Sequence, residues 1–277
     1  KTGPDCSYVQ EGDYVIATWV RRNPIKGRYL PDLKGVSYQE KKLNCRITFT
    51  WSEIIMSEDE YIVKIPKKYA TPESCIVGCS ILTGAGAVKN TAKVKPGETV
   101  AIFGVGGIGL AAVKMASLLN ASKIIAIDID SEKLEFSKQF GATHTINSIE
   151  NNPIDEIIDL TNGGVDYAFD AIGKKITMNQ IFEAVKQGGS GADNTGGTSI
   201  LIGIPESPEI TLDANQILLT QKTFKGSLGA TYPEKDFIYF LEMYKKGEFP
   251  INKMISKSFN LSEINEACHK LESGEIT

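Results

Sequence analysis

The stretch that most constrains the fold of this chain runs from residue 100 to Asp128. An apolar run at 100–103 leads into a cluster of glycines, an Ala-rich helical segment continues to Leu119, and a second apolar run at 123–127 ends at Asp128. The glycines of the cluster are Gly104, Gly106, Gly107 and Gly109. Strand, glycine turn, helix, strand and acid, in this order, are typical of a dinucleotide-binding βαβ unit. We therefore predict a parallel sheet built around these two strands.

Each residue type in the glycine turn has a physical role. Gly104 permits a sharp turn, Gly106 lets the backbone approach a pyrophosphate, and Gly109 lets the helix pack closely on the strand. The unpaired N–H groups at the helix N-terminus attract phosphates. Asp128 follows Gly109 by about 20 residues. A carboxylate there accepts hydrogen bonds from the adenosine ribose hydroxyls and repels a 2′-phosphate, so the sequence favours NAD over NADP.

Strands and helices are expected to alternate through the middle of the chain. The predicted strands are 100–103, 123–127, 144–147, 165–170, 198–203 and 223–227, and the predicted helices are 107–119, 132–140, 154–160, 178–185 and 215–219. The strands are nearly all apolar, as expected when both faces of a sheet are covered. The pattern predicts an α/β fold with a doubly wound, six-stranded parallel sheet of the Rossmann type.

The flanking segments have a different pattern. Short apolar runs at 13–19, 46–51 and 61–65 predict β-rich structure. Near the end, a helix is expected at 235–246, an extended piece at 254–259 and then a helix that Ser262 caps. We therefore expect a nucleotide-binding domain at 83–230, inserted between two parts of a second domain at 1–82 and 231–277.

Composition excludes several classes of protein. The net charge of −4 gives no basic surface for nucleic acid, and no apolar run reaches the roughly 18 residues that span a membrane. The odd number of cysteines, 5, argues against a disulfide framework. A reducing, cytoplasmic setting is the simplest interpretation.

Several motifs, in this order, identify a family. They are Gly12-Asp-Tyr-Val15, Gly78-Cys-Ser-Ile-Leu-Thr-Gly84, Val94-Lys-Pro-Gly-Glu-Thr-Val100, Asp166-Tyr-Ala-Phe-Asp-Ala-Ile-Gly173, Phe224-Lys-Gly-Ser227 and Ala267-Cys-His-Lys-Leu271. With them the chain resembles the zinc-type alcohol dehydrogenase branch of the medium-chain dehydrogenases. The resemblance implies a Rossmann sheet inserted into a β-rich, GroES-like catalytic domain. It also implies hydride transfer between an alcohol or aldehyde and NAD at a catalytic zinc.

The resemblance assigns roles to individual residues. Cys79 matches the third protein ligand of the catalytic zinc, and Thr83 matches a contact to the nicotinamide end of the cofactor. Val105, Gly106, Gly107 and Ile108 match the pyrophosphate contacts, and Asp128 and Lys133 match the ribose contacts. Ile172, Gly173, Ile202 and Ile204 match the walls of the cofactor cleft. Each assignment has a plainer alternative: Cys79 as a small buried side chain, the isoleucines as strand packing, and Lys133 as a solvated helix charge.

The chain also departs from the family pattern. The family's first catalytic cysteine and its Gly-His-Glu motif correspond to positions before Lys1, and its closing strand to positions after Thr277. Neither His144 nor His269 matches a ligand position. The stretch that matches the structural-zinc lobe contains no cysteine before Cys45, so no structural zinc is expected. We expect the chain to be an incomplete, by itself inactive part of a longer enzyme.

Two other functions remain open at this stage. A zinc-free quinone or enoyl reductase would use the same cofactor domain, although Cys79 and Asp128 argue against it. A cofactor-binding or assembly module would have no chemistry of its own. In the complete enzyme, the strand at 223–227 would end the sheet with an unpaired edge, so we expect a homodimer or homotetramer.

Overall fold

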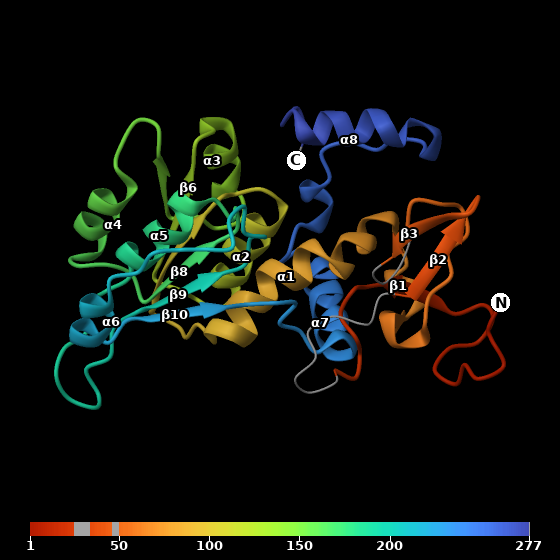
Figure 1. The fold of residues 1–277 in the computed structure, drawn as a ribbon, viewed down its shortest axis with the longest axis horizontal. Coiled ribbons are helices and arrows are strands. Elements are labelled where there is room, and N and C mark those ends of the chain that lie inside the picture. Colours follow the sequence, from red (N-terminus) through yellow and green to blue (C-terminus); the bar gives the residue numbers. More distant parts are fainter. Residues whose placement is uncertain (25–33, 46–49, 277) are drawn as a thin grey trace. The chain divides into compact units, whose positions relative to one another are not determined.

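The computed structural model describes residues 1–24, 34–45 and 50–276 (Figure 1). The chain folds into two compact units. One unit is the continuous segment 80–230, and the other combines residues 1–79 with 231–277. In the sequence, the continuous unit thus lies between the two segments of the other.

The unit 80–230 is built on the predicted six-stranded parallel sheet, which the structure confirms. Its strands are β5 (Thr99–Phe103), β6 (Lys123–Asp128), β7 (His144–Asn147), β8 (Tyr167–Asp170), β9 (Thr198–Leu201) and β10 (Thr223–Gly226). They lie in the order β10-β9-β8-β5-β6-β7. The chain thus adds β6 and β7 on one side of β5 and then returns to add β8, β9 and β10 on the other.

The helices of this unit lie close to their predicted positions. They are α2 (Gly107–Leu118), α3 (Ser131–Lys138), α4 (Pro153–Thr161), α5 (Lys175–Ala184) and α6 (Ala214–Thr220). Side chains of Asp130, Asn152 and Asp213 cap α3, α4 and α6 by accepting hydrogen bonds from the first turn. One helical segment was not predicted: α1 (Ser80–Gly86) continues as a π-helix over Ala87–Ala92 and packs on α2.

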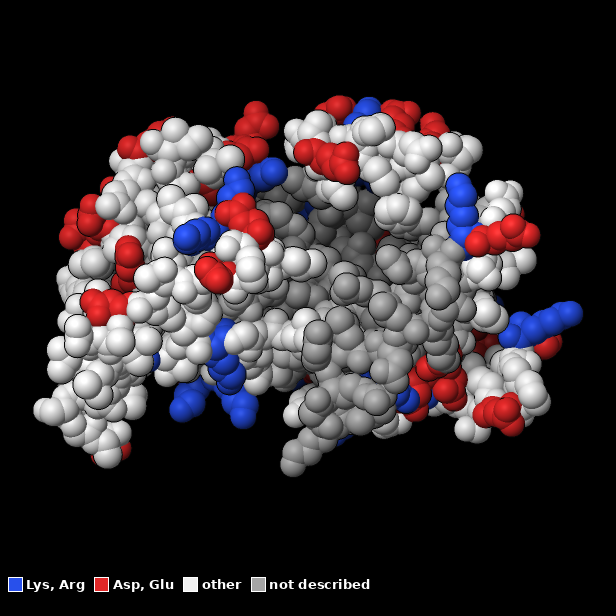
Figure 2. Space-filling model, viewed as in Figure 1, with Lys and Arg blue, Asp and Glu red and all other residues white. Residues whose placement is uncertain are grey.

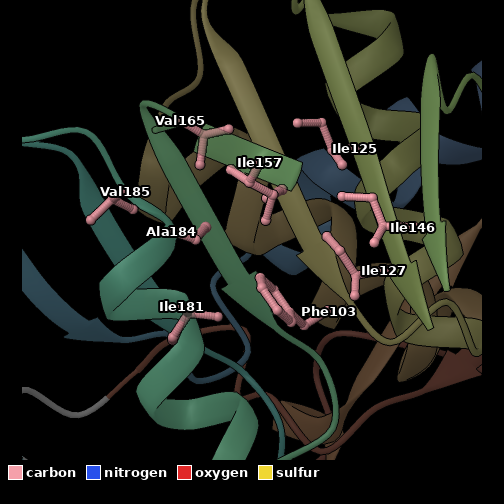
Figure 3. Close-up of a cluster of buried hydrophobic side chains, with 11 residues drawn as sticks. Phe103, Ile125, Ile127, Ile146, Ile157, Val165, Ile181, Ala184 and Val185 are labelled. Carbon is pink, nitrogen blue, oxygen red and sulfur yellow. The ribbon is translucent and has the colours of Figure 1, made fainter. Parts of the chain in front are cut away.

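The core of the unit follows the alternation of side chains along the strands. Phe103, Ile125 and Ile127 point to the face that α4 and α5 cover, where they meet Ile157 and Ile181 (Figure 3). Ile102, next along β5, faces α2 on the opposite side, because its Cγ2 lies 3.5 Å from where a methyl group on Gly109 would be. Both faces of the sheet are therefore covered.

The two ends of this unit are joined to each other. The Asn90 side chain donates to the carbonyl of Ala230 at 2.7 Å, and the hydroxyls of Thr91 and Ser227 lie 2.8 Å apart. The entering and leaving segments of the chain therefore run next to each other.

The other unit contains two small antiparallel sheets. β1 (Tyr14–Ala17) pairs with β4 (Ile62–Ile65), and β2 (Lys34–Tyr38) forms a hairpin with β3 (Lys41–Cys45). Strands were expected at the sites of β1 and β4, whereas the hairpin was not, and the predicted strand at 46–51 falls largely outside the described residues. The helices are α7 (Pro233–Lys245) and α8 (Ile264–Glu272), with short 3-10 turns at Asp59–Tyr61, Lys67–Tyr69, Pro72–Gly78, Ile251–Met254 and Leu261–Glu263.

Near the end of the chain, the expected extended piece at 254–259 begins within the 3-10 turn Ile251–Met254 and pairs with no strand among the described residues. The cap of the last helix differs from prediction. The turn before α8 is capped from Asn260 rather than Ser262, since the Asn260 N–H donates to the Glu263 carboxylate at 2.7 Å. The acid three positions after Asn260 completes a capping box, which explains the shift.

Among the described residues, no helix has the length and apolar character needed to cross a membrane. Acidic and basic side chains are interspersed on the face that Figure 2 shows.

Candidate nucleotide-binding site

The candidate site lies where the order of the strands changes direction. β5 and β8 are neighbours in the sheet, with Phe103 opposite Asp170 at their carboxyl ends. The strands that follow β5 and β8 in the sequence extend the sheet in opposite directions. In open α/β sheets, ligands bind outside the carboxyl ends of the strands at such a point. The turns that follow β5 and β8 therefore border the candidate site.

The glycine turn after β5 combines tight packing with open space. Gly104 has a φ of +88°, and a methyl group on Gly109 would lie 1.8 Å from the Gly104 carbonyl oxygen. The turn thus needs Gly104 for its backbone conformation and Gly109 for the close approach of α2. Around Gly106, by contrast, nothing lies within 4 Å of where a methyl group would stand. The start of α2 is open there to an approaching ligand.

Asp128 stands at the end of β6, beside this turn. Its Oδ2 accepts a hydrogen bond from the Val105 N–H at 2.9 Å, and its Oδ1 accepts from Ile129 and Asp130 at 2.8 and 3.2 Å. Because a carboxylate offers about four lone-pair positions, Oδ2 keeps one for a further donor. Asp128 therefore ties the glycine turn to β6 and can still accept from a hydroxyl.

The remaining predicted cofactor contacts lie on four segments of the same unit. Thr83 is buried in α1, and Lys133 is half-buried in the first turn of α3. Ile172 and Gly173 form the turn after β8, and Ile202 and Ile204 lie in the turn after β9. Ile204 is 91% exposed and Ile172 39%, so neither is ordinary strand packing. Ile172 lies over the glycine turn: a methyl group on Gly104 would come within 2.5 Å of its Cγ1.

One residue of this edge received no role in the sequence analysis. Asp170, the last residue of β8, is fully buried, and its Oδ1 accepts hydrogen bonds from Ile172 and Gly173. Burial raises the pKa of this carboxyl, which hydrogen bonds from Gly173, Ile172 and the Thr177 side chain oppose. The signal that could have found it is a carboxylate at the end of an otherwise apolar strand.

Cys79 lies in the other unit, in a hollow of about 640 Å³. Main-chain and side-chain atoms of 14–19 and 70–79 form most of the walls, and Cys75 lines the same hollow. Cys79 is accessible to solvent, yet partial burial raises the pKa of its thiol, and a hydrogen bond with Trp19 opposes that rise. The alternative of a fully buried cysteine is therefore wrong for Cys79.

The described residues do not bring a full set of zinc ligands to Cys79. A catalytic zinc needs three protein ligands. No group of three His, Cys, Asp or Glu side chains suited to a metal occurs in the described part of the chain. His144 lies in β7 and bonds to the Thr143 hydroxyl, and His269 lies exposed in α8 beside Glu272. Among the described residues, the hollow thus holds the thiols of Cys75 and Cys79 but not three zinc ligands.

Comparison with known proteins places this geometry among dehydrogenases. The family described as zinc-binding dehydrogenase matches residues 107–246. The chain is 32% identical over 275 residues to alcohol dehydrogenase class-3 of Zea mays, covering 98% of this chain and 70% of the relative. It is 36% identical over 276 residues to alcohol dehydrogenase 1 of Pisum sativum, covering 98% of this chain and 71% of the relative.

Solved structures give the same result. The crystal structure of benzyl alcohol dehydrogenase from Acinetobacter calcoaceticus is similar over 100% of this chain and 79% of its own, with a TM-score of 0.82 and 29% identity. The alcohol dehydrogenase zinc-binding domain protein from Burkholderia ambifaria matches over 80% of this chain and 58% of its own, with a TM-score of 0.73 and 32% identity. The chain thus spans only part of each of these proteins.

Proposed function

Because the chain belongs to the zinc-binding dehydrogenase family, we propose that its unit 80–230 binds a nicotinamide dinucleotide, with NAD(H) preferred over NADP(H). The observation that carries the proposal is the open space over Gly106 at the start of α2, beside the Asp128 carboxylate on the next strand. The helix N-terminus suits the pyrophosphate, and the carboxylate suits the ribose hydroxyls while repelling a 2′-phosphate.

The other cofactor contacts are proposed on the same basis. Val105, Gly107 and Ile108 contribute backbone groups to the pyrophosphate, and Lys133 pairs with the ribose. Thr83 contacts the nicotinamide end. The turns with Ile172–Gly173 and Ile202–Ile204 form the walls of the cleft, which their position at the carboxyl edge of the sheet supports.

For the whole protein we propose oxidation of an alcohol, or reduction of the matching aldehyde. The names of the relatives in Zea mays and Pisum sativum support this reaction class. A bound NAD⁺ would supply the acceptor for the hydride of the alcohol carbon, and the hydroxyl proton would be released to water. In this division of roles the unit 80–230 is the nucleotide-binding domain, and the segments 1–79 and 231–277 belong to the catalytic domain. The free thiols of Cys6, Cys75, Cys79 and Cys268 favour a reducing compartment, the cytoplasm.

Zinc enters the proposal only through Cys79. Its thiolate would be one of three protein ligands, and the described residues do not provide the other two. We therefore assign no reaction step to zinc, and we expect the 277-residue chain to bind NADH without zinc-dependent turnover.

Cofactor binding is tested by titrating the protein with NADH and with NADPH and following the fluorescence of the reduced nicotinamide. We expect NADH to bind at least about tenfold more tightly, since a phosphate beside a carboxylate costs more than about 1.4 kcal/mol. Equal affinities would remove the basis for the NAD preference, and no binding of either would overturn the proposal as a whole.

The role of Cys79 is tested in a protein that carries the family's other zinc ligands as well as this chain. Cys79→Ala and chelation should each abolish alcohol oxidation, whereas Cys75→Ala, in the same hollow, should leave it largely intact. Full activity after Cys79→Ala would instead favour a zinc-free reductase, and activity with quinones or enones but not alcohols would identify it.

A further inference from the structure

We propose that Asp170 is a positioning residue that holds the two turns bordering the nucleotide site in their binding-competent arrangement. The inference rests on the proposed function, because the affinity it affects is that for the dinucleotide. It assigns a role to a residue that does not itself contact the cofactor.

Four backbone N–H groups from two turns converge on Asp170. Its Oδ1 accepts from Ile172 at 2.8 Å and from Gly173 at 3.0 Å. Its carbonyl oxygen accepts from Ile202 and Gly203, each at 2.9 Å. The side chain therefore fixes the turn after β8, and the main chain of the same residue fixes the turn after β9.

These two turns are packed backbone against backbone. Gly173 has a φ of +89°, and a methyl group on it would lie 2.1 Å from the Ile204 carbonyl oxygen. A methyl group on Gly203 would lie 2.4 Å from the Gly173 nitrogen. With so little free space, a displaced 171–173 turn cannot relax without moving the 202–204 turn as well.

The turn that Asp170 holds also touches the glycine turn. The Ala171 N–H donates to the Phe103 carbonyl at 2.9 Å, directly before Gly104. The Ile172 side chain packs against Gly104, in the space that a side chain at position 104 would occupy. Asp170 thereby connects the turn that would hold the pyrophosphate with the turns that would line the cleft.

The burial of Asp170 indicates why a carboxyl group serves here. Asp170 is fully buried, and its Oδ1 accepts from the buried Gly173 N–H and from the N–H of the partly exposed Ile172. An N–H that is buried without an acceptor is unfavourable. Removal of the Asp170 side chain would take away the acceptor of both N–H groups, which the turn relieves by opening.

The experiment compares three variants for NADH affinity and for stability in urea. Asp170→Ala should raise the Kd for NADH by about tenfold or more, since it removes the acceptor of both N–H groups. Asp170→Asn keeps the Oδ1 acceptor and should stay within about threefold of the original Kd. Asp166→Ala is the matched control. Asp166 lies directly before β8, at the amino ends of the strands and away from the candidate site, where it bonds to Thr99 and Lys186.

The outcomes separate positioning from a merely structural role. Asp166→Ala should lower the unfolding free energy and leave the Kd for NADH unchanged. If Asp170→Ala keeps the original Kd, or if Asp166→Ala weakens NADH binding to the same extent, the positioning role is wrong.

A second measurement does not need cofactor binding or a folded Ala variant. In the unmodified protein, the amides of Ile172 and Gly173 should exchange with solvent as slowly as those of β8, and far more slowly than the exposed Gly191. Rapid exchange at both would overturn the inference. Absence of NADH binding together with protected amides would overturn the proposed function and leave the structural anchoring by Asp170 intact.

Discussion

Gly106 and Gly109 both stand at the start of α2, yet their surroundings differ. A methyl group on Gly109 would overlap the Gly104 carbonyl, whereas one on Gly106 would meet nothing within 4 Å. Gly109→Ala should therefore lower the unfolding free energy by about 2–3 kcal/mol, because overpacking forces the backbone apart. Gly106→Ala should cost less than about 1 kcal/mol and yet weaken NADH binding. Urea unfolding and NADH titration of both variants measure this contrast; equal destabilisation would contradict it.

Asp128 bonds to the glycine turn and is also the residue proposed to select the cofactor. Asp128→Ser should weaken NADH binding and bring the affinities for NADH and NADPH closer together, since the charge that repels a 2′-phosphate is gone. Asp130→Ala, two positions later, removes the cap of α3 and should cost about 1 kcal/mol of stability with the cofactor preference unchanged. Isothermal titration with both cofactors tests the pair. An unchanged preference in Asp128→Ser would show that another group selects the cofactor.

The sequence predicted residues whose role is local and missed one whose role is not. The turn at Gly104 and the close packing at Gly109 follow from positions along one βαβ unit. The Asp170 side chain bonds to N–H groups only two and three residues later, but its proposed role of joining two turns also needs its carbonyl oxygen, which Ile202 and Gly203 reach only after β8 and β9 have paired. No short-range pattern contains that pairing.

Among the elements, prediction succeeded for strands that are buried on both faces. β5 and β6 are covered on both faces, so they are continuous apolar runs, and their predicted limits differ from the observed ones by one residue. The hairpin of β2 and β3 lacks such a run, and its turn uses Gln39 and Glu40 at positive φ rather than glycine. α1 was missed because Gly84 and Gly86 weaken its helical pattern. Gly84 is there for contact with α2, since a methyl group on it would lie 2.0 Å from the Ile108 carbonyl oxygen.

The two ends of β8 carry carboxyl groups with opposite pKa shifts. Burial alone would raise the pKa of Asp166, but hydrogen bonds from Lys186 and Thr99 outweigh it and lower that pKa. Because the folded-state pKa lies below the unfolded one, Asp166 contributes stability above about pH 4, and this contribution is lost as the pH falls through the folded-state pKa.

Asp166→Asn should therefore be less stable than the original protein at pH 7, by about 1 kcal/mol after allowance for solvent screening of a half-buried pair. The difference should shrink toward zero as the pH falls below about 4. Urea unfolding at a series of pH values measures it, and a difference that does not vary with pH would contradict the prediction.

For the whole molecule, the exposed edge of the large sheet predicts self-association. β10 is its last strand, and the preceding α6 buries none of its residues, with Leu218 74% exposed. We predict a homodimer or homotetramer that uses this edge. Leu218→Asp should shift the protein toward monomer at micromolar concentration. Ile149→Asp, equally exposed beyond the opposite edge strand β7, should not. Sedimentation velocity tests both, and an unmodified protein that sediments as a monomer would contradict the prediction.

The hydrogen bonds that join residues 90–91 to 227–230 bear on how such a protein can change over evolutionary time. A domain whose first and last segments lie side by side can be inserted into another protein at a single position in a surface loop. Because these two segments lie side by side, we expect insertion of the unit into another protein, or circular permutation of it, to leave its interior undisturbed. The unit 80–230 is thus suited to remain unchanged as a whole while the segments around it acquire new side chains.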